Sequence, residues 1–160
     1  MPGTLSKSCA TYIFMACGWA YLCAIVDWAS RCALAHRVSI SMDVGLCVEA
    51  LQDALLRHGQ PEISSQFTSD AFTEPLLALG VQISMDGRGA WRDNVFVERL
   101  WRSIKYEEVY LHAYESVGDA KAAIARYIDF YNSRRPHSSL AKKTPDEFYF
   151  ATLRHLQAAA

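Results

Sequence analysis

The sequence has no Cys-x-x-Cys pair, almost no net charge, and no internal repeat or low-complexity linker. Its formal net charge is −1, and its 5 cysteines lack the spacing of a zinc site. We interpret them as small buried thiols of a protein in a reducing cytoplasm, rather than as a disulfide or metal framework. A hydrophobic content of 51 % and a charged content of 21 % favour a globular domain over a disordered chain.

Charge is also absent from residues 8–26, a stretch of about 19 residues that is near the length of a membrane span. A membrane helix or a signal peptide is therefore conceivable. Against both, Tyr12, Gly18 and Trp19 interrupt the run, and strand-forming residues are frequent on either side of them. We expect a β-hairpin that turns near residues 16–18, and no membrane partner.

The 160 residues are enough for one compact domain with a core. We expect a single domain over residues 1–160, with a loose end at residues 1–8 and a helical part at residues 116–160. Charge is distributed unevenly, because residues 1–87 carry four Lys and Arg against eight Asp and Glu, whereas residues 88–143 carry eleven against seven. A basic second half is compatible with binding of nucleic acid.

Hydrophobic periodicity and turn residues predict an alternation of strands and helices. Strands are expected at residues 11–15, 20–27, 32–39, 61–63 and 81–84, and the fourth is unusually short. Helices are expected at residues 41–58, 69–79, 93–105, 116–131 and 144–157. Ser41 is the expected cap of the first helix, with Asp43 in its first turn, and the last two helices begin with capping boxes at Ser116 and Thr144. This order predicts an α/β domain with a mixed sheet.

The helix at residues 93–105 follows a glycine-rich turn at residues 86–89, and Asp93 or Asn94 is its expected N-cap. One face of this helix is apolar, and the residues expected on the other face are Asn94, Glu98, Arg102 and Lys105. A carboxylate that can bind a metal ion, beside cations that can hold a phosphate backbone, is the layout of a site that cuts nucleic acid. A solvated helix face with ordinary charge pairs has the same pattern, and these residues alone do not separate the two.

Several stretches carry a resemblance to a known family: residues 21–31 (YLCAIVDWASR), 65–69 (SQFTS), 84–105 (SMDGRGAWRDNVFVERLWRSIK), 127–137 (YIDFYNSRRPH) and Thr144-Pro145. From about residue 9 onward, the chain resembles the integrase core of the DDE insertion-sequence transposases, which is related to retroviral integrase. The resemblance implies a ribonuclease H-like α/β fold with a mixed five-stranded sheet, flanking helices and a shortened fourth strand.

The resemblance also implies DNA cutting and strand transfer, in which three carboxylates hold two Mg²⁺ or Mn²⁺ ions. Glu98 matches the third carboxylate, so it is the candidate catalytic residue and metal ligand. Candidate DNA-binding residues share a positive charge or a place in a matched basic motif; they are Arg88, Arg92, Arg102, Lys105, Arg134, Arg135 and His137. The implied partners are transposon ends and target DNA, with a homo-oligomer or a mixed oligomer with intact transposase. The implied location is the bacterial cytoplasm, in association with the nucleoid.

Two departures from the family pattern concern the other carboxylates. The first catalytic Asp of the family lies two residues before Thr-Tyr-Ile, where this chain has Cys9. The second lies in an Asn-Thr-Asp-Gln-Gly segment that is missing here, because Ile63-Ser64 runs directly into Ser65. We therefore expect a degenerate core without strand-transfer activity. The alternative is a non-catalytic DNA-binding or assembly module that inhibits intact transposase.

Other acidic or soft ligands could substitute for the missing carboxylates. Asp27 ends a predicted strand, but the family carries Asp-Trp-x-Ser-Arg outside its catalytic set, so we expect a turn carboxylate. Asp86 and Asp93 flank the helix of Glu98, and Asp93 is expected to cap it. The thiolate of Cys9 suits zinc better than magnesium.

Overall fold

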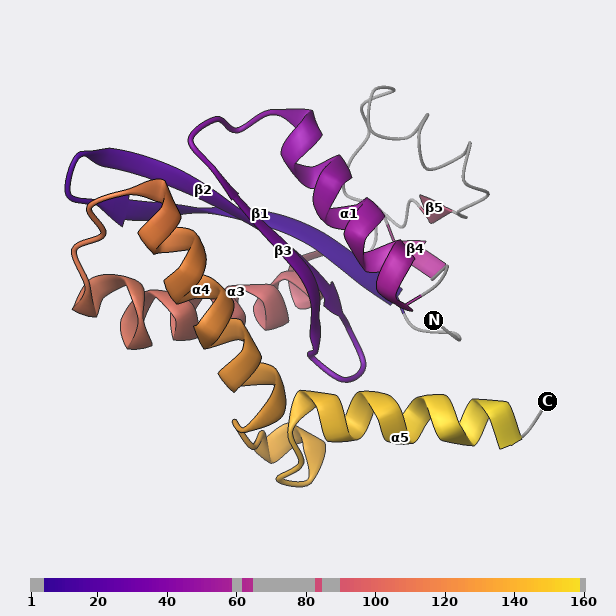
Figure 1. Cartoon of the computed structure of the whole chain (residues 1–160). Coiled ribbons are helices and arrows are strands. Elements are labelled where there is room, and N and C mark those ends of the chain that lie inside the picture. The colour runs from indigo at the N-terminus through magenta and orange to yellow at the C-terminus, as the bar shows by residue number, and fades with distance from the viewer. Residues whose placement is uncertain (1–4, 59–61, 65–82, 85–89, 159–160) are drawn as a thin grey trace.

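The computed structural model describes residues 5–58, 62–64, 83–84 and 90–158, and every structural statement below concerns this part of the chain (Figure 1). The strands are β1 (Leu5–Met15), β2 (Gly18–Asp27), β3 (Ala33–Ser39), β4 (Glu62–Ser64) and β5 (Ile83–Ser84). The helices are α1 (Val44–His58), α3 (Ala90–Glu107), α4 (Val117–Ser133) and α5 (Pro145–Ala158), with short 3-10 turns η1 (Val109–Leu111) and η2 (Ser138–Leu140). The helix predicted at residues 69–79 lies outside the described residues.

The strands form one mixed sheet in the order β3-β2-β1-β4-β5, which confirms the predicted five-stranded mixed sheet. β1, β2 and β3 are antiparallel neighbours, whereas β4 runs parallel to β1 and β5 runs parallel to β4. β4 is only three residues long, and its register with β1 covers Leu5 and Ser6. The fourth strand is therefore short, as the sequence predicts.

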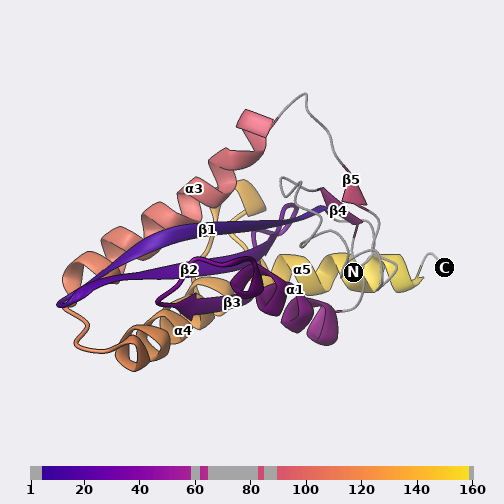
Figure 2. The same cartoon turned by 90° about the horizontal axis from the view of Figure 1, so that it is seen from above.

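The sheet is covered by helices on both faces (Figures 1 and 2). Along β2, Leu22 and Ala24 belong to the core that includes α3 and α4, whereas Cys23 and Ile25 belong to the core that includes α1. This alternation follows the two-residue period of a strand. Because both faces of β2 are buried, its sequence is an almost continuous apolar run rather than an apolar-polar alternation.

The uncharged stretch of residues 8–26 forms the β1–β2 hairpin, and Met15 pairs with Gly18 across the turn. Gly18 has a φ of +114°, a conformation that side chains with a Cβ rarely adopt. The hairpin prediction is confirmed. β1 begins at Leu5, however, so the expected loose end is wrong for residues 5–8: residues 6–8 pair with β2, and Leu5 pairs with Glu62 of β4. No helix in the described part of the chain is both long and apolar enough to span a membrane.

Two helix starts differ from the prediction. α1 begins at Val44, and Asp43 caps it by accepting a hydrogen bond from the Leu46 N–H at 3.0 Å; the predicted cap, Ser41, instead donates to Asp43. α3 begins at Ala90, so Asp93 and Asn94 lie inside the helix and do not cap it. The two capping boxes are confirmed, at Ser116 with Asp119 and at Thr144 with Glu147.

Candidate functional site

α3 presents the face that the sequence predicts. Glu98 and Arg102 are exposed and Lys105 is half-buried, while Leu100 and Ile104 are buried in the core against the sheet. The three polar residues lie one turn and about two turns apart on the same side of the helix. The carboxylate of Glu98 is exposed and makes no ion pair with any described residue.

The positions of the other two family carboxylates lie on neighbouring elements. Cys9 in β1 pairs with Ala24 in β2, and Ala24 belongs to the core layer that includes α3. β4 ends at Ser64. Across the described segments, no group of three or more His, Cys, Asp or Glu side chains could hold a metal ion. A site for two magnesium ions needs several oxygen ligands, and Glu98 is the one carboxylate at these three positions. The donor set does not fit such a site.

Asp27 has a structural role in the turn between β2 and β3. Its side chain is 1 % exposed, and its Oδ2 accepts hydrogen bonds from the Ser30 N–H at 2.9 Å and from the Ser30 hydroxyl at 2.6 Å. The prediction of a turn carboxylate is confirmed.

Arg31, which sequence reasoning did not select, connects this turn to α3. Its φ is +64°, and its guanidinium carbon lies 3.2 Å from the centre of the Phe96 ring. Burial lowers the pKa of Arg31, and the charge of Arg99 lowers it further against the opposing effects of Tyr131 and Asp27. The matched motif at residues 27–31 was the only signal in the sequence that could have pointed to this residue.

Arg135, a predicted DNA-binding residue, makes internal contacts. It forms an ion pair with Glu107 of α3 and donates to the Tyr127 hydroxyl at 2.9 Å. Burial would raise the pKa of Glu107, but hydrogen bonds from Arg135 and Tyr127 outweigh burial, and the pKa lies below its usual value. The adjacent Arg134 is exposed and has no ion pair with any residue the structure describes.

His137 packs against α4. Its ring meets the Tyr131 ring edge-on, with 4.9 Å between centroids. Burial lowers the pKa of His137, and the positive charges of Arg135, Arg31 and Arg99 lower it further. These surroundings therefore favour the neutral form of His137. Burial also raises the pKa of Tyr131 to about 12.

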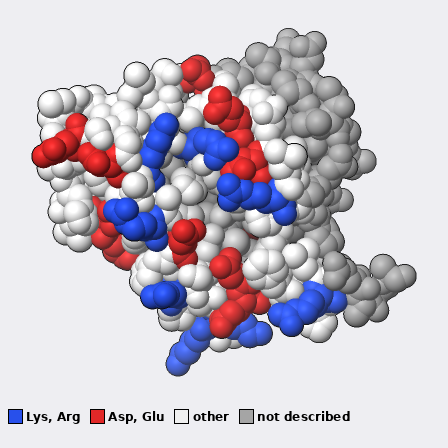
Figure 3. Space-filling view, in the orientation of Figure 1, with Lys and Arg blue, Asp and Glu red and all other residues white. Residues whose placement is uncertain are grey.

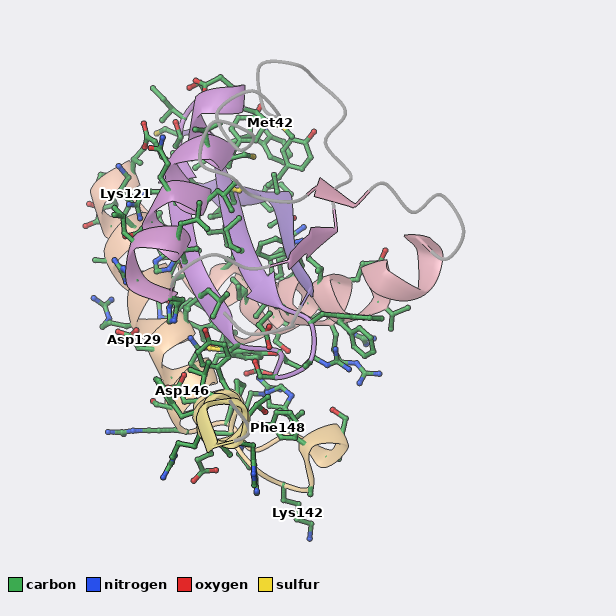
Figure 4. The ribbon with its side chains drawn as sticks, turned by 90° about the vertical axis from the view of Figure 1, so that its right-hand side faces the viewer. Met42, Lys121, Asp129, Lys142, Asp146 and Phe148 are labelled. Carbon is green, nitrogen blue, oxygen red and sulfur yellow. The ribbon has the colours of Figure 1, made fainter. Side chains whose placement is uncertain are left out.

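The predicted cations that the structure describes lie on two segments, α3 and the residues that follow α4. Lys and Arg are interspersed with Asp and Glu on the face shown in Figure 3. Lys142 and Asp146 lie at the end of the molecule opposite Met42, in the loop before α5 and in its first turn (Figure 4). Arg88 and the side chain of Arg92 fall outside the described part. The structure thus brings Glu98, Arg102 and Lys105 together on α3, and Arg134, Arg135 and His137 together after α4.

Sequence comparison relates the chain to an integrase core domain and to transposases. A family described as integrase core domain matches residues 79–145. The transposase of insertion sequence element IS904 from Lactococcus lactis is 32 % identical over 146 residues, which cover 86 % of this chain and 58 % of that transposase. Transposase InsF of IS3A from Escherichia coli is 30 % identical over 146 residues, covering 86 % of this chain and 51 % of InsF. The chain spans about half the length of these curated relatives.

Solved structures share the fold. The catalytic core domain of BIV integrase superposes with a TM-score of 0.68 at 16 % identity, covering 96 % of this chain and 97 % of that chain. The catalytic core domain of HTLV-2 integrase in complex with magnesium has a TM-score of 0.63 at 16 % identity, covering 92 % and 95 %. These matches confirm the predicted ribonuclease H-like fold.

Proposed function

The chain belongs to the integrase-core domains of insertion-sequence transposases, and on that premise we propose that it binds DNA without catalysing strand transfer. In this proposal, residues 1–160 form one degenerate integrase core, whose helical part is residues 116–160. The protein acts in the bacterial cytoplasm, in association with the nucleoid.

One observation carries the loss of catalysis. Of the three positions where the family has carboxylates, only Glu98 still holds one; Cys9 occupies the position in β1, and Ser64, the last residue of β4, is followed directly by Ser65. A bound pair of Mg²⁺ or Mn²⁺ ions would supply activation of the attacking oxygen and stabilisation of the leaving oxygen. Loss of outer-shell support alone lowers metal affinity or activity by about 10- to 100-fold, so loss of two direct ligands is expected to cost more.

DNA binding is supported by the exposed face of α3. Arg102 and Lys105 lie on the side of the helix that carries Glu98, and neither makes an ion pair within the described residues. Cations that are not neutralised by internal carboxylates can release counterions from a phosphate backbone, and this release drives binding at low salt. Arg88, Arg92 and Arg134 are proposed to add phosphate contacts. Arg135 and His137 are proposed DNA-binding residues as well, but their side chains also contact residues of α3 and α4.

Nicking and joining of supercoiled plasmid test the catalytic half of the proposal. The purified chain is incubated with plasmid and Mg²⁺ or Mn²⁺, and the Glu98→Gln variant serves as the control. We expect no metal-dependent product from either protein. A metal-dependent product that the Glu98→Gln variant lacks would show an active site and overturn the proposal. Binding of duplex DNA, measured in parallel at low salt, tests the proposed DNA binding. Absence of binding would contradict that part of the proposal.

A second proposed function is assembly with intact transposase subunits, which the chain would inhibit. It is supported by the two packed cores: helices cover both faces of the sheet, and an intact transposase subunit could contact these helices. Coexpression with a tagged intact transposase tests this idea. Copurification together with a lower transposition frequency is the expected result, and separate elution with unchanged transposition contradicts it.

A further inference from the structure

A row of aromatic side chains runs from the β1–β2 hairpin to the end of α3. Its members, in spatial order, are Tyr21, Tyr12, Trp19, Phe14, Tyr110 and Tyr106. The centroids of successive rings are between 4.4 and 6.2 Å apart. All of these side chains except Tyr21 are 46–64 % exposed. Contiguous exposed apolar surface of this kind usually marks a binding site.

The strand register accounts for the first part of the row. Tyr12 pairs with Tyr21 and Phe14 pairs with Trp19, so these side chains share one face of the hairpin. That face is covered by α1 around Cys23 and is left uncovered at the hairpin end. η1 then adds Tyr110, whose ring lies 6.2 Å from that of Phe14. A backbone hydrogen bond from Ala16 to Tyr114, at 3.0 Å, holds the segment after η1 against the hairpin.

The row ends at a cation. The guanidinium carbon of Arg102 lies 5.7 Å from the centre of the Tyr106 ring, which itself contacts Tyr110. Tyr106 is about 12 Å along the helix axis from Glu98, since each residue adds about 1.5 Å. The row therefore continues directly from the α3 face proposed to hold DNA.

Nearby carboxylates already have other partners. Glu107 pairs with Arg135, and Glu108 accepts from the Tyr114 hydroxyl at 3.2 Å and pairs with His112 at 3.3 Å. Arg102, the cation at the end of the row, forms no ion pair with a described carboxylate; Glu98 lies one turn away on the same face of α3. Unpaired nucleotides are bound by aromatic rings on which the bases stack, together with nearby cations that contact the phosphates.

The hairpin end of the row is also concave. Tyr12, Trp19 and Tyr21 line a hollow of about 320 Å³. A wall made of aromatic side chains offers a flat base a stacking surface without demanding a particular pattern of hydrogen bonds, so binding there is expected to tolerate any base sequence.

We propose that this aromatic row binds unpaired nucleotides of single-stranded DNA, with bases stacked on the rings and phosphates held by Arg102 and Lys105. The inference rests on the proposed function for the two phosphate contacts. It adds a preference of the same site for strands whose bases are unpaired. If a DNA strand is separated from its complement next to the Glu98 face of α3, the aromatic row would bind its unpaired bases.

A matched pair of ligands tests the proposal on the unmodified chain. One is an oligonucleotide of about twelve thymidines, within the usual site sizes for such surfaces, and the other is an abasic strand of the same length and charge. We expect the thymidine strand to bind at least about tenfold more tightly, because each stacked base contributes about that factor or more. The Trp19→Leu and Phe14→Leu variants should lose this difference and still bind the abasic strand equally. Phe150→Leu, which alters an exposed ring on α5, is the control and should change neither affinity.

Each contrary outcome has a distinct meaning. Equal binding of the two strands by the unmodified chain overturns the aromatic site and leaves the phosphate contacts standing. No binding of either strand or of duplex DNA at low salt overturns the site and the proposed function together. Equal binding combined with a dimer that Trp19→Leu dissociates in sedimentation shows that a second copy covers the row, which also overturns the inference. The comparison of ligands does not depend on any variant folding.

Discussion

Asn132, in the last turn of α4, binds both backbone polar groups of Ala33 in β3. Its Oδ1 accepts from the Ala33 N–H at 3.0 Å, and its Nδ2 donates to the Ala33 carbonyl at 2.9 Å. β3 is an edge strand of the sheet, so this side chain satisfies an edge position that no further strand covers. Within the motif at residues 131–137, Asn132 therefore attaches α4 to the sheet, whereas the exposed Arg134 can contact a ligand.

Asn132→Ala is expected to lower the free energy of unfolding by about 1–3 kcal/mol, because it leaves two partly buried backbone groups without partners. Urea unfolding followed by circular dichroism measures the change. Ser133→Ala, at the exposed neighbouring position, is the control and should stay within about 0.5 kcal/mol of the unmodified chain. Equal stability of the two variants would contradict a fastening role for Asn132.

Arg135→Ala and Arg134→Ala are expected to separate stability from DNA binding. Arg135→Ala removes an ion pair to Glu107 and a hydrogen bond to Tyr127, and both are partly exposed, so it should lower the free energy of unfolding by about 1 kcal/mol. Arg134→Ala should leave stability unchanged and weaken duplex binding. Thermal melts and fluorescence anisotropy with labelled duplex measure the two effects. If Arg134→Ala destabilised the fold as much as Arg135→Ala, the internal contacts of Arg135 would not explain its effect.

Lys105→Ala is expected to reduce the slope of the logarithm of DNA affinity against the logarithm of salt concentration by about one, since one phosphate contact is lost. The affinity should fall similarly for unrelated duplex sequences, because a phosphate contact carries no sequence information. Lys121→Ala changes an exposed lysine on α4 and is the control (Figure 4). An unchanged salt slope for Lys105→Ala would remove this residue from the DNA-binding face.

Restoring both missing carboxylates is expected to create metal-dependent activity. The variant combines Cys9→Asp with insertion of Asn-Thr-Asp-Gln-Gly between Ser64 and Ser65, and Glu98 supplies the third ligand. Plasmid nicking with Mg²⁺ measures the gain, with either single change as a control that should remain inactive. If the restored variant folds, binds Mg²⁺ and still yields no product, the loss of activity has another origin than these two sites.

Acidification is expected to destabilise the fold. Burial lowers the pKa of His36, and the charge of Arg37 lowers it further; burial and three arginines lower that of His137. The unfolded chain therefore binds more protons than the folded one below the usual histidine pKa of about 6.5, so this stabilisation is complete above that pH and is lost as the pH falls. Urea unfolding between about pH 7.5 and pH 5 measures it. His137→Gln should reduce the pH dependence, and greater stability in acid would contradict the assignment.

The sequence by itself determined the succession of strands along the chain, the hairpin, the two capping boxes and the polar face of α3. These features depend on local patterns: alternation or helical spacing of apolar residues, and capping side chains within three residues of a helix start. The sequence also determined that Cys9 and the junction at Ser64-Ser65 lack carboxylates, because residue identity needs no structure. The cap of α1 was placed two residues too early, since Ser41 and Asp43 are both good capping residues and only the backbone path selects between them.

Only the tertiary structure decided which charged and aromatic residues have partners. Arg135 looks like its neighbour Arg134 in the sequence, yet it lies beside Glu107, 28 residues away, and this contact depends on how α3 and α4 pack. The aromatic row likewise joins two paired strands, a 3-10 turn and the end of α3, which come together through the sheet register and a single backbone hydrogen bond. Contacts between residues far apart in the chain depend on the packing of whole elements, which no local pattern encodes.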